Sequence, residues 1–209
     1  GGAVTGLGIE STSFRNGLPH DPVLEIDIRT AAGEILTASP HHHADLFRAF
    51  PNSYGSLGYA TRLLIELERV PGYVALRHVR FRDAAAVAGT VEDIVASGAR
   101  DGTRVDAIDG VAFEPGEYYL TLATWTDRPA GPLSDYTGQD IYYRSIQHDH
   151  GSISDRLTIH DYLWRWDTDW FWCSRAFGAQ NPVVRRLWPK SRLRSDVYWK
   201  LVALDRRTS

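Results

Sequence analysis

The sequence contains no methionine and a single cysteine, Cys173, in its 209 residues. One cysteine excludes a disulfide within the chain and is typical of a reducing compartment. No apolar run approaches the ~20 residues that a transmembrane helix requires, and no signal peptide is visible. The net charge of −3 gives no electrostatic reason to expect a nucleic-acid partner. These absences indicate a cytoplasmic protein, and the ordinary content of 43% hydrophobic and 23% charged residues indicates a globular one.

Glycine is concentrated in the first seventeen residues, which read G-G-x-x-x-G-x-G-x-x-S-x-S-x-x-x-G. Glycine lets the backbone approach a flat or polyanionic ligand, and serine and threonine hydroxyls can donate to phosphate oxygens. The pattern therefore favours a ligand-binding loop. Two alternatives stay open: a dinucleotide fingerprint, which would have to open a helix, and a plain glycine-rich turn. Residues 10–19 are a poor helix start, which disfavours the fingerprint.

The next residues alternate between strand and helix patterns. Residues 22–30 and 35–38 predict two strands joined by a turn at 32–34. Ser39 and Pro40 predict the N-cap and first position of a helix over residues 41–50. The glycine-containing segment 53–61 precedes a further strand at 62–68. Three consecutive histidines at the expected helix start point in different directions and predict an exposed first turn rather than a metal site.

The order of these elements resembles that of the FAD-linked oxidase family, of the vanillyl-alcohol-oxidase or p-cresol-methylhydroxylase type. The order is a glycine loop, two strands, a helix with the sequence D-L-F-x-A-F, a loop with the sequence G-S-L-G, and a further strand. The wording G-x-G-I-E-S-x-S-x-x-x-G-L is most similar to the Δ24-sterol reductase (diminuto-like) branch and its bacterial relatives. The Y-L-W-R-W, F-W and N-P elements of residues 162–182 resemble the same branch.

The resemblance implies that FAD is the cofactor and that two segments of the chain wrap it. For the flavin and pyrophosphate region it points to Thr5, Gly6, Gly8, Ile9, Ser11, Ser13 and Gly17. For a second wall it points to Gly55, Ser56, Leu57 and Gly58. The upstream half of the family's FAD domain does not appear in the sequence, so we expect a fragment of a longer flavoprotein.

The resemblance also implies an α+β fold divided into two parts. Residues 1–70 would be the second lobe of a p-cresol-methylhydroxylase-type FAD-binding domain. Residues 71–209 would be part of an α+β cap domain over the reactive edge of the flavin. The residue pattern agrees, since it predicts strands at 73–81, 104–113 and 118–126 and a helix from Ala84 to about Ser97, capped by Asp83. Antiparallel strands with a helix on one face are the expected arrangement.

The end of the chain is dense in aromatic residues. Residues 127–158 predict a long polar loop, followed by an aromatic helix at 159–177. That helix would pack in the core, line a pocket for a flat lipid-like substrate, or lie at a membrane interface. The basic residues between 185 and 194 leave peripheral contact with anionic lipids as an alternative.

Two residues of this region are candidates for catalysis. His160 and Arg165 lie in the segment that would face the substrate in the family, where a cation would stabilise charge on the flavin or orient the substrate. The structural alternative pairs Arg165 with Asp161, Asp167 or Asp169.

The resemblance implies flavin-mediated hydride transfer on a sterol-like or other hydrophobic alkene, with a nicotinamide or O₂ as the redox partner. A sugar or aldonolactone oxidase is the alternative enzyme. A non-catalytic truncated remnant or interaction module is the alternative of another class.

Overall fold

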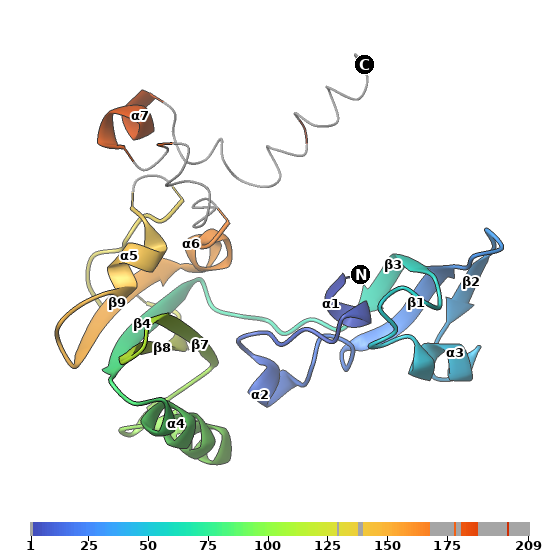
Figure 1. Ribbon diagram of the computed structural model, residues 1–209, viewed down its shortest axis with the longest axis horizontal. Coiled ribbons are helices and arrows are strands. Elements are labelled where there is room, and N and C mark those ends of the chain that lie inside the picture. The colour runs from blue at the N-terminus through green and yellow to red at the C-terminus, as the bar shows by residue number, and fades with distance from the viewer. Residues whose placement is uncertain are drawn as a thin grey trace. The chain divides into compact units, whose positions relative to one another are not determined.

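The computed structural model describes residues 2–128, 130–137, 140–167, 178, 181–187 and 200. The chain divides into two compact units, Gly1–Arg69 and Val70–Ser209. Each unit contains its own antiparallel sheet and its own cluster of buried apolar side chains. The predicted α+β class is thereby confirmed (Figure 1).

The first unit is a three-stranded sheet with short helices. The sheet order is β2-β1-β3, and both neighbouring pairs are antiparallel. Its core consists of six buried residues, and β1 contributes three of them. Ile26 and Ile28 are alternate residues of the strand, and Val23 joins them across an irregularity in the register with β3. The elements in chain order are α1 (Gly2–Thr5), α2 (Ser13–Asn16), β1 (Val23–Arg29), β2 (Ile35–Ala38), α3 (Ala44–Ala49) and β3 (Tyr59–Ile65).

The helix predicted over residues 41–50 is shorter than expected. Ser39 does not cap it, because the Ser39 hydroxyl and carbonyl are used in a turn that accepts hydrogen bonds from the amides of His41 and His42. His43 is the N-cap instead, with a left-handed φ of 47°. The three histidines therefore precede the helix. The prediction that they form its first turn was wrong. All three are exposed, as expected.

The second unit is built on a four-stranded sheet of order β7-β8-β4-β9, in which all neighbouring pairs are antiparallel. Asp83 caps the long helix by accepting from the amides of Ala85 and Ala86, and Gly98 ends it with a φ of 70°, as the sequence predicts. The elements are β4 (Tyr73–Phe81), α4 (Ala84–Ser97), β5 (Ala99–Arg100), β6 (Thr103–Arg104), β7 (Ala107–Glu114), β8 (Glu117–Thr126), α5 (Tyr142–Ile146), β9 (Ser152–Thr158), α6 (Ile159–Trp164) and α7 (Pro182–Leu187).

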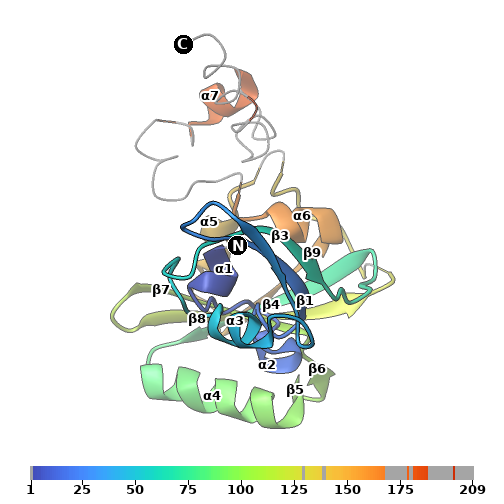
Figure 2. The same cartoon turned by 90° about the vertical axis from the view of Figure 1, so that its right-hand side faces the viewer.

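The two faces of this sheet are covered by different helices. Figures 1 and 2 show α4 on one side of the sheet and α5 and α6 on the other. Leu76 and Val74 of β4 pack with Tyr142 and Tyr162 of α5 and α6, whereas the alternate residues of β4 point to the opposite face.

Two predictions for this region need correction. The segment 127–158 is not a continuous loop, because it contains α5 and the edge strand β9, which pairs with β4 from Tyr73 to Val79. The aromatic helix begins at Ile159 as expected but is helical only to Trp164, and residues 168–177, with Cys173, lie outside the described residues.

Candidate functional site

Backbone hydrogen bonds join the two glycine segments of the first unit. The amide of Tyr54 donates to the carbonyl of Thr5 at 2.9 Å, and the amide of Asn52 donates to the carbonyl of Val4 at 3.3 Å. The loop that carries Gly55 to Gly58 is therefore attached to α1, at the start of the first glycine segment. The segments that the sequence nominates as two walls of one cofactor site are thus neighbours, although about fifty residues separate them along the chain.

Some of these glycines are required by the fold itself. A Cβ on Gly58, whose φ is 120°, would lie 2.3 Å from the carbonyl oxygen of Arg29. A Cβ on Gly17, whose φ is 77°, would lie 2.4 Å from a carboxylate oxygen of Asp21. No ligand is needed to explain glycine at these two positions.

Other positions of the two segments offer open surface that fits a flat or anionic group. A Cβ on Gly55 would meet only the ring of Tyr59, at 3.9 Å. Ile9 is 82% exposed, and Leu57 of the facing segment is also exposed. The Ser13 hydroxyl accepts from the Glu10 amide, and the Ser56 hydroxyl donates to the Ser53 carbonyl, so these two hydroxyls already stabilise their own turns.

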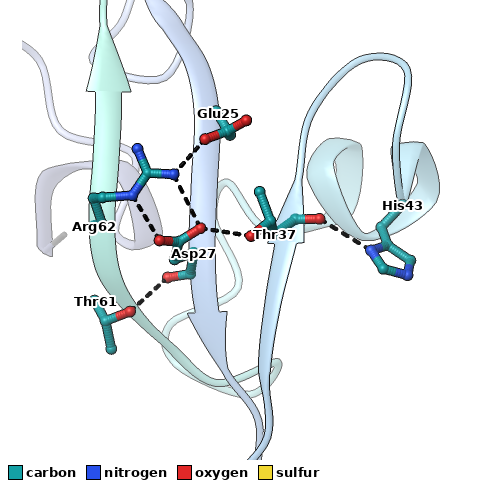
Figure 3. Close-up of polar contacts among 6 residues, drawn as sticks. All are labelled: Glu25, Asp27, Thr37, His43, Thr61 and Arg62. Atoms are coloured by element: carbon teal, nitrogen blue, oxygen red, sulfur yellow. Dashed lines mark hydrogen bonds and ion pairs between the residues drawn. The ribbon is translucent and has the colours of Figure 1, made fainter.

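A charged network that the sequence analysis missed crosses the solvent-facing side of the same sheet (Figure 3). Arg62 of β3 forms an ion pair with Asp27 at 2.6 Å and a second one with Glu25. Thr37 of β2 donates to Asp27 at 2.8 Å. The hydrogen bonds from Arg62 and Thr37 lower the pKa of Asp27. Because the one guanidinium is paired with both carboxylates, this network links the three strands rather than presenting a free cation.

In the second unit, Arg165 is a buried cation. Its guanidinium forms an ion pair with Asp109 of β7 at 2.6 Å and donates to the carbonyl of Tyr162. It lies 3.8 Å from the ring centroid of Tyr162 and 5.4 Å from that of Tyr142. Burial opposes the charge, but Asp109 and the two tyrosines outweigh it and keep the pKa of Arg165 above its usual value. Arg165 is therefore a fixed positive charge within an aromatic cluster.

Asp109, the ion-pair partner of Arg165, is not among the three residues that the sequence suggested. Asp161 instead accepts from Thr137 and Thr158, and Asp169 lies outside the described residues. Asp109 is 56 positions away from Arg165 and reaches it only through the sheet. No local pattern in the sequence marks this pair.

Two further polar side chains lie in the row of Asp109 on the sheet. Asp109, Thr121 and His78 follow one another across β7, β8 and β4. His78 is fully buried, and its Nδ1 lies 2.7 Å from the Thr121 hydroxyl. Burial lowers the pKa of His78 to about 4, so the ring is neutral at pH 7. Polar groups in an apolar core mark this face as a candidate functional surface.

His160, the second candidate, occupies a different environment. It lies on α6 and is exposed, whereas Arg165 is buried. The structure thus offers a buried cation at one candidate position and a solvent-facing ring at the other.

Comparisons with known proteins agree with the sequence resemblance. No family model matches the chain. The chain is 30% identical to the Delta(24)-sterol reductase of Arabidopsis thaliana over 131 residues, which are 61% of the chain and 23% of that protein. It is 30% identical to cytokinin dehydrogenase 2 of Oryza sativa subsp. japonica over 133 residues, which are 62% of the chain and 23% of that protein.

The resemblance to the FAD-linked oxidase family is thereby confirmed, because the relatives of the chain include FAD-linked oxidoreductases. The relatives named above are flavoproteins of this family. The fold agrees, because a solved structure of Physcomitrella patens BBE-like 1 superposes with a TM-score of 0.53 at 18% identity and covers 79% of the chain and 35% of that protein. The chain spans about a quarter of the length of the curated relatives it matches.

The structure does not fit a dinucleotide fingerprint, because α1 is only 4 residues long and begins at Gly2 rather than after the glycines. None of the helices in the described part of the chain is long and apolar enough to cross a membrane.

Proposed function

We propose that the protein is an FAD-dependent oxidoreductase that acts on a hydrophobic small molecule. Bound FAD supplies the hydride chemistry, and the protein supplies position and electrostatics. The observation that carries the proposal is the pair of hydrogen bonds that attaches the loop before Gly55 to α1. It supports a single cofactor surface made from both nominated segments.

In this proposal the first unit contributes part of the FAD site. Gly55 allows close approach of the cofactor, whereas Gly8 packs against Ala3 and shapes the first segment. The exposed side chains of Ile9 and Leu57 offer apolar contact to a flat ring. Gly17 and Gly58 hold the two segments in shape. The hydroxyl-bearing residues and remaining glycines complete the proposed set: Thr5, Gly6, Ser11, Ser13 and Ser56.

The second unit carries the two residues proposed for catalysis, Arg165 and His160. Arg165 would stabilise negative charge that develops during hydride transfer, and its fixed geometry favours this role. The rings of Tyr142 and Tyr162 are buried in the core of this unit, where they hold the guanidinium of Arg165 in place. His160 would act from the solvent side. The name of one relative, a sterol reductase, favours a sterol-like alkene as substrate.

The test is a visible absorbance spectrum of the purified protein after addition of FAD and removal of the excess. We expect retained flavin absorbance. Ile9→Glu should abolish retention, because a carboxylate would stand against the cofactor, whereas Leu67→Glu should not. Leu67 is an equally exposed residue of the same unit, at 80% against 82%, but lies outside both segments.

Two outcomes would contradict the proposal. A colourless protein that also fails to bind added FAD supports the non-catalytic alternative. Equal loss of flavin in both variants shows that the effect is not specific to the nominated segments. Consumption of a nicotinamide or of O₂ by a flavin-loaded protein would then identify the redox partner.

A further inference from the structure

A pocket of about 210 Å³ lies on the second unit, on the face of the four-stranded sheet opposite α5 and α6. Its floor is formed by alternate residues of β8, β4 and β9. The strand register sets Ala75 between Thr124 and Arg156, and Arg77 between Leu122 and Ser154. The β6 segment forms the remaining wall and is tied to the sheet because the Thr124 hydroxyl donates to the Arg104 carbonyl at 2.6 Å.

Three arginines from separate segments line this pocket. Arg77 of β4 donates to Asp101 at 2.9 Å, and Arg104 of β6 pairs with Asp106 at 2.7 Å. The guanidinium of Arg156 has no hydrogen-bond or ion-pair partner within the described part of the chain. It lies against Gly131, where a Cβ would stand 3.4 Å from its Nη1 atom.

The charges at the pocket do not cancel. Asp101 and Asp106 compensate two of the three arginines. Asp155 also lines the pocket, but its carboxylate accepts from Ser134 and Tyr136. Its position opposite Leu76 in the register turns its side chain to the other face of the sheet. One uncompensated guanidinium thus remains in a concave site of a protein whose net charge is −3.

We propose that this pocket binds a phosphate group of a small molecule. Guanidinium groups present planar pairs of N–H donors that match phosphate oxygens, and hydroxyls of Ser154 and Thr103 add donors at the rim. Donors that converge from three segments suit a tetrahedral anion. A planar carboxylate, by contrast, needs only the two parallel N–H donors of one guanidinium group. The inference is independent of the proposed FAD site.

The test is calorimetric titration of the protein with inorganic pyrophosphate at low ionic strength. Arg156→Gln should weaken binding about tenfold, which is the loss expected for one charge-assisted contact. The matched control is Arg82→Gln, because Arg82 is an exposed arginine of the same unit outside the pocket. It should leave the affinity unchanged.

A second variant tests the pocket without removing an arginine. Ser154→Asp places a carboxylate between Arg77 and Arg156 and should abolish pyrophosphate binding. Ser152→Asp, on the same strand but outside the pocket lining, should not. Absence of pyrophosphate binding, equal weakening by Arg82→Gln, or equally tight binding of malonate would each overturn the assignment of a phosphate site.

Discussion

The two units of this chain place their polar groups differently. In the first unit, the Arg62 network lies on the solvent-facing side of the sheet, and its guanidinium is 50% exposed. In the second unit, Arg165 and Asp109 lie within the core, and the Arg165 side chain is 7% exposed. The first unit also exposes large apolar side chains such as Ile9 and Tyr59. The first unit thus exposes its polar network and several large apolar side chains to solvent, whereas the second unit buries its polar cluster in the core.

The largest expected effect tests whether the two units unfold separately. Phe50→Ala removes a fully buried ring from the six-residue core of the first unit and should cost about 4 kcal/mol of unfolding free energy. Hydrogen exchange should then accelerate in β1, β2 and β3 while β4 and β8 stay protected.

The matched variant Leu157→Ala should do the converse, since Leu157 is fully buried in the core of the second unit. Loss of protection in both units from either substitution would mean that they unfold as one cooperative body.

The contrast between buried and exposed ion pairs gives the next prediction. Arg165→Met leaves Asp109 without its partner and should destabilise the second unit by about 3 kcal/mol, measured by urea denaturation. The double variant Arg165→Met with Asp109→Leu should recover most of this loss, because it leaves no unpaired charge.

Arg62→Met is the comparison in the first unit. Its partners Asp27 and Glu25 stay accessible to water, so the midpoint of denaturation should hardly move. A large loss there would show that the exposed network stabilises the sheet more than solvent screening allows.

A pH dependence should belong to the second unit. The folded pKa of His78, about 4, is below its ordinary value of 6.5, so the unfolded chain binds more protons between these values. Stability should therefore fall by roughly 3 kcal/mol as the pH decreases from 6.5 to 4, and should not change above that window. Asp155, His148 and Arg165 are the charged or titratable neighbours that act on His78.

His78→Gln removes this ionisation. The denaturation midpoint should therefore change less with pH in the variant than in the parent. The difference between the two should equal the effect of protonating one histidine. Parallel profiles would show that His78 does not control acid stability.

The smallest expected effect concerns two glycines. Gly58→Ala in the first unit should cost about 2 kcal/mol, because its backbone is left-handed and its Cβ would contact the Arg29 carbonyl. Gly72→Ala in the second unit should change stability by only about 0.5 kcal/mol, since no atom lies within 4 Å of the added Cβ. Equal effects in a thermal melt would contradict the assignment of Gly58 to the fold.

Local chemistry was sufficient to predict many elements of the chain. The alternation of β4, the Asp83 cap and the end of α4 at Gly98 each depend on residues within or next to one element. The prediction failed where local signals competed. Ser39 had the residue type of an N-cap, but a turn took its hydrogen-bonding groups. The edge strand β9 was missed because most of its residues are polar and only Ile153 and Leu157 mark its apolar face.

The sequence by itself determined the resemblance to FAD-linked oxidases, the α+β class and the two glycine segments, because these depend on the order and spacing of residues. Only the tertiary structure decided which distant side chains meet. Asp109 reaches Arg165, Thr121 reaches His78, and Arg77 and Arg156 line one pocket, because antiparallel pairing brings together strands that are far apart along the chain. Those encounters depend on register, and register is a property of the assembled sheet.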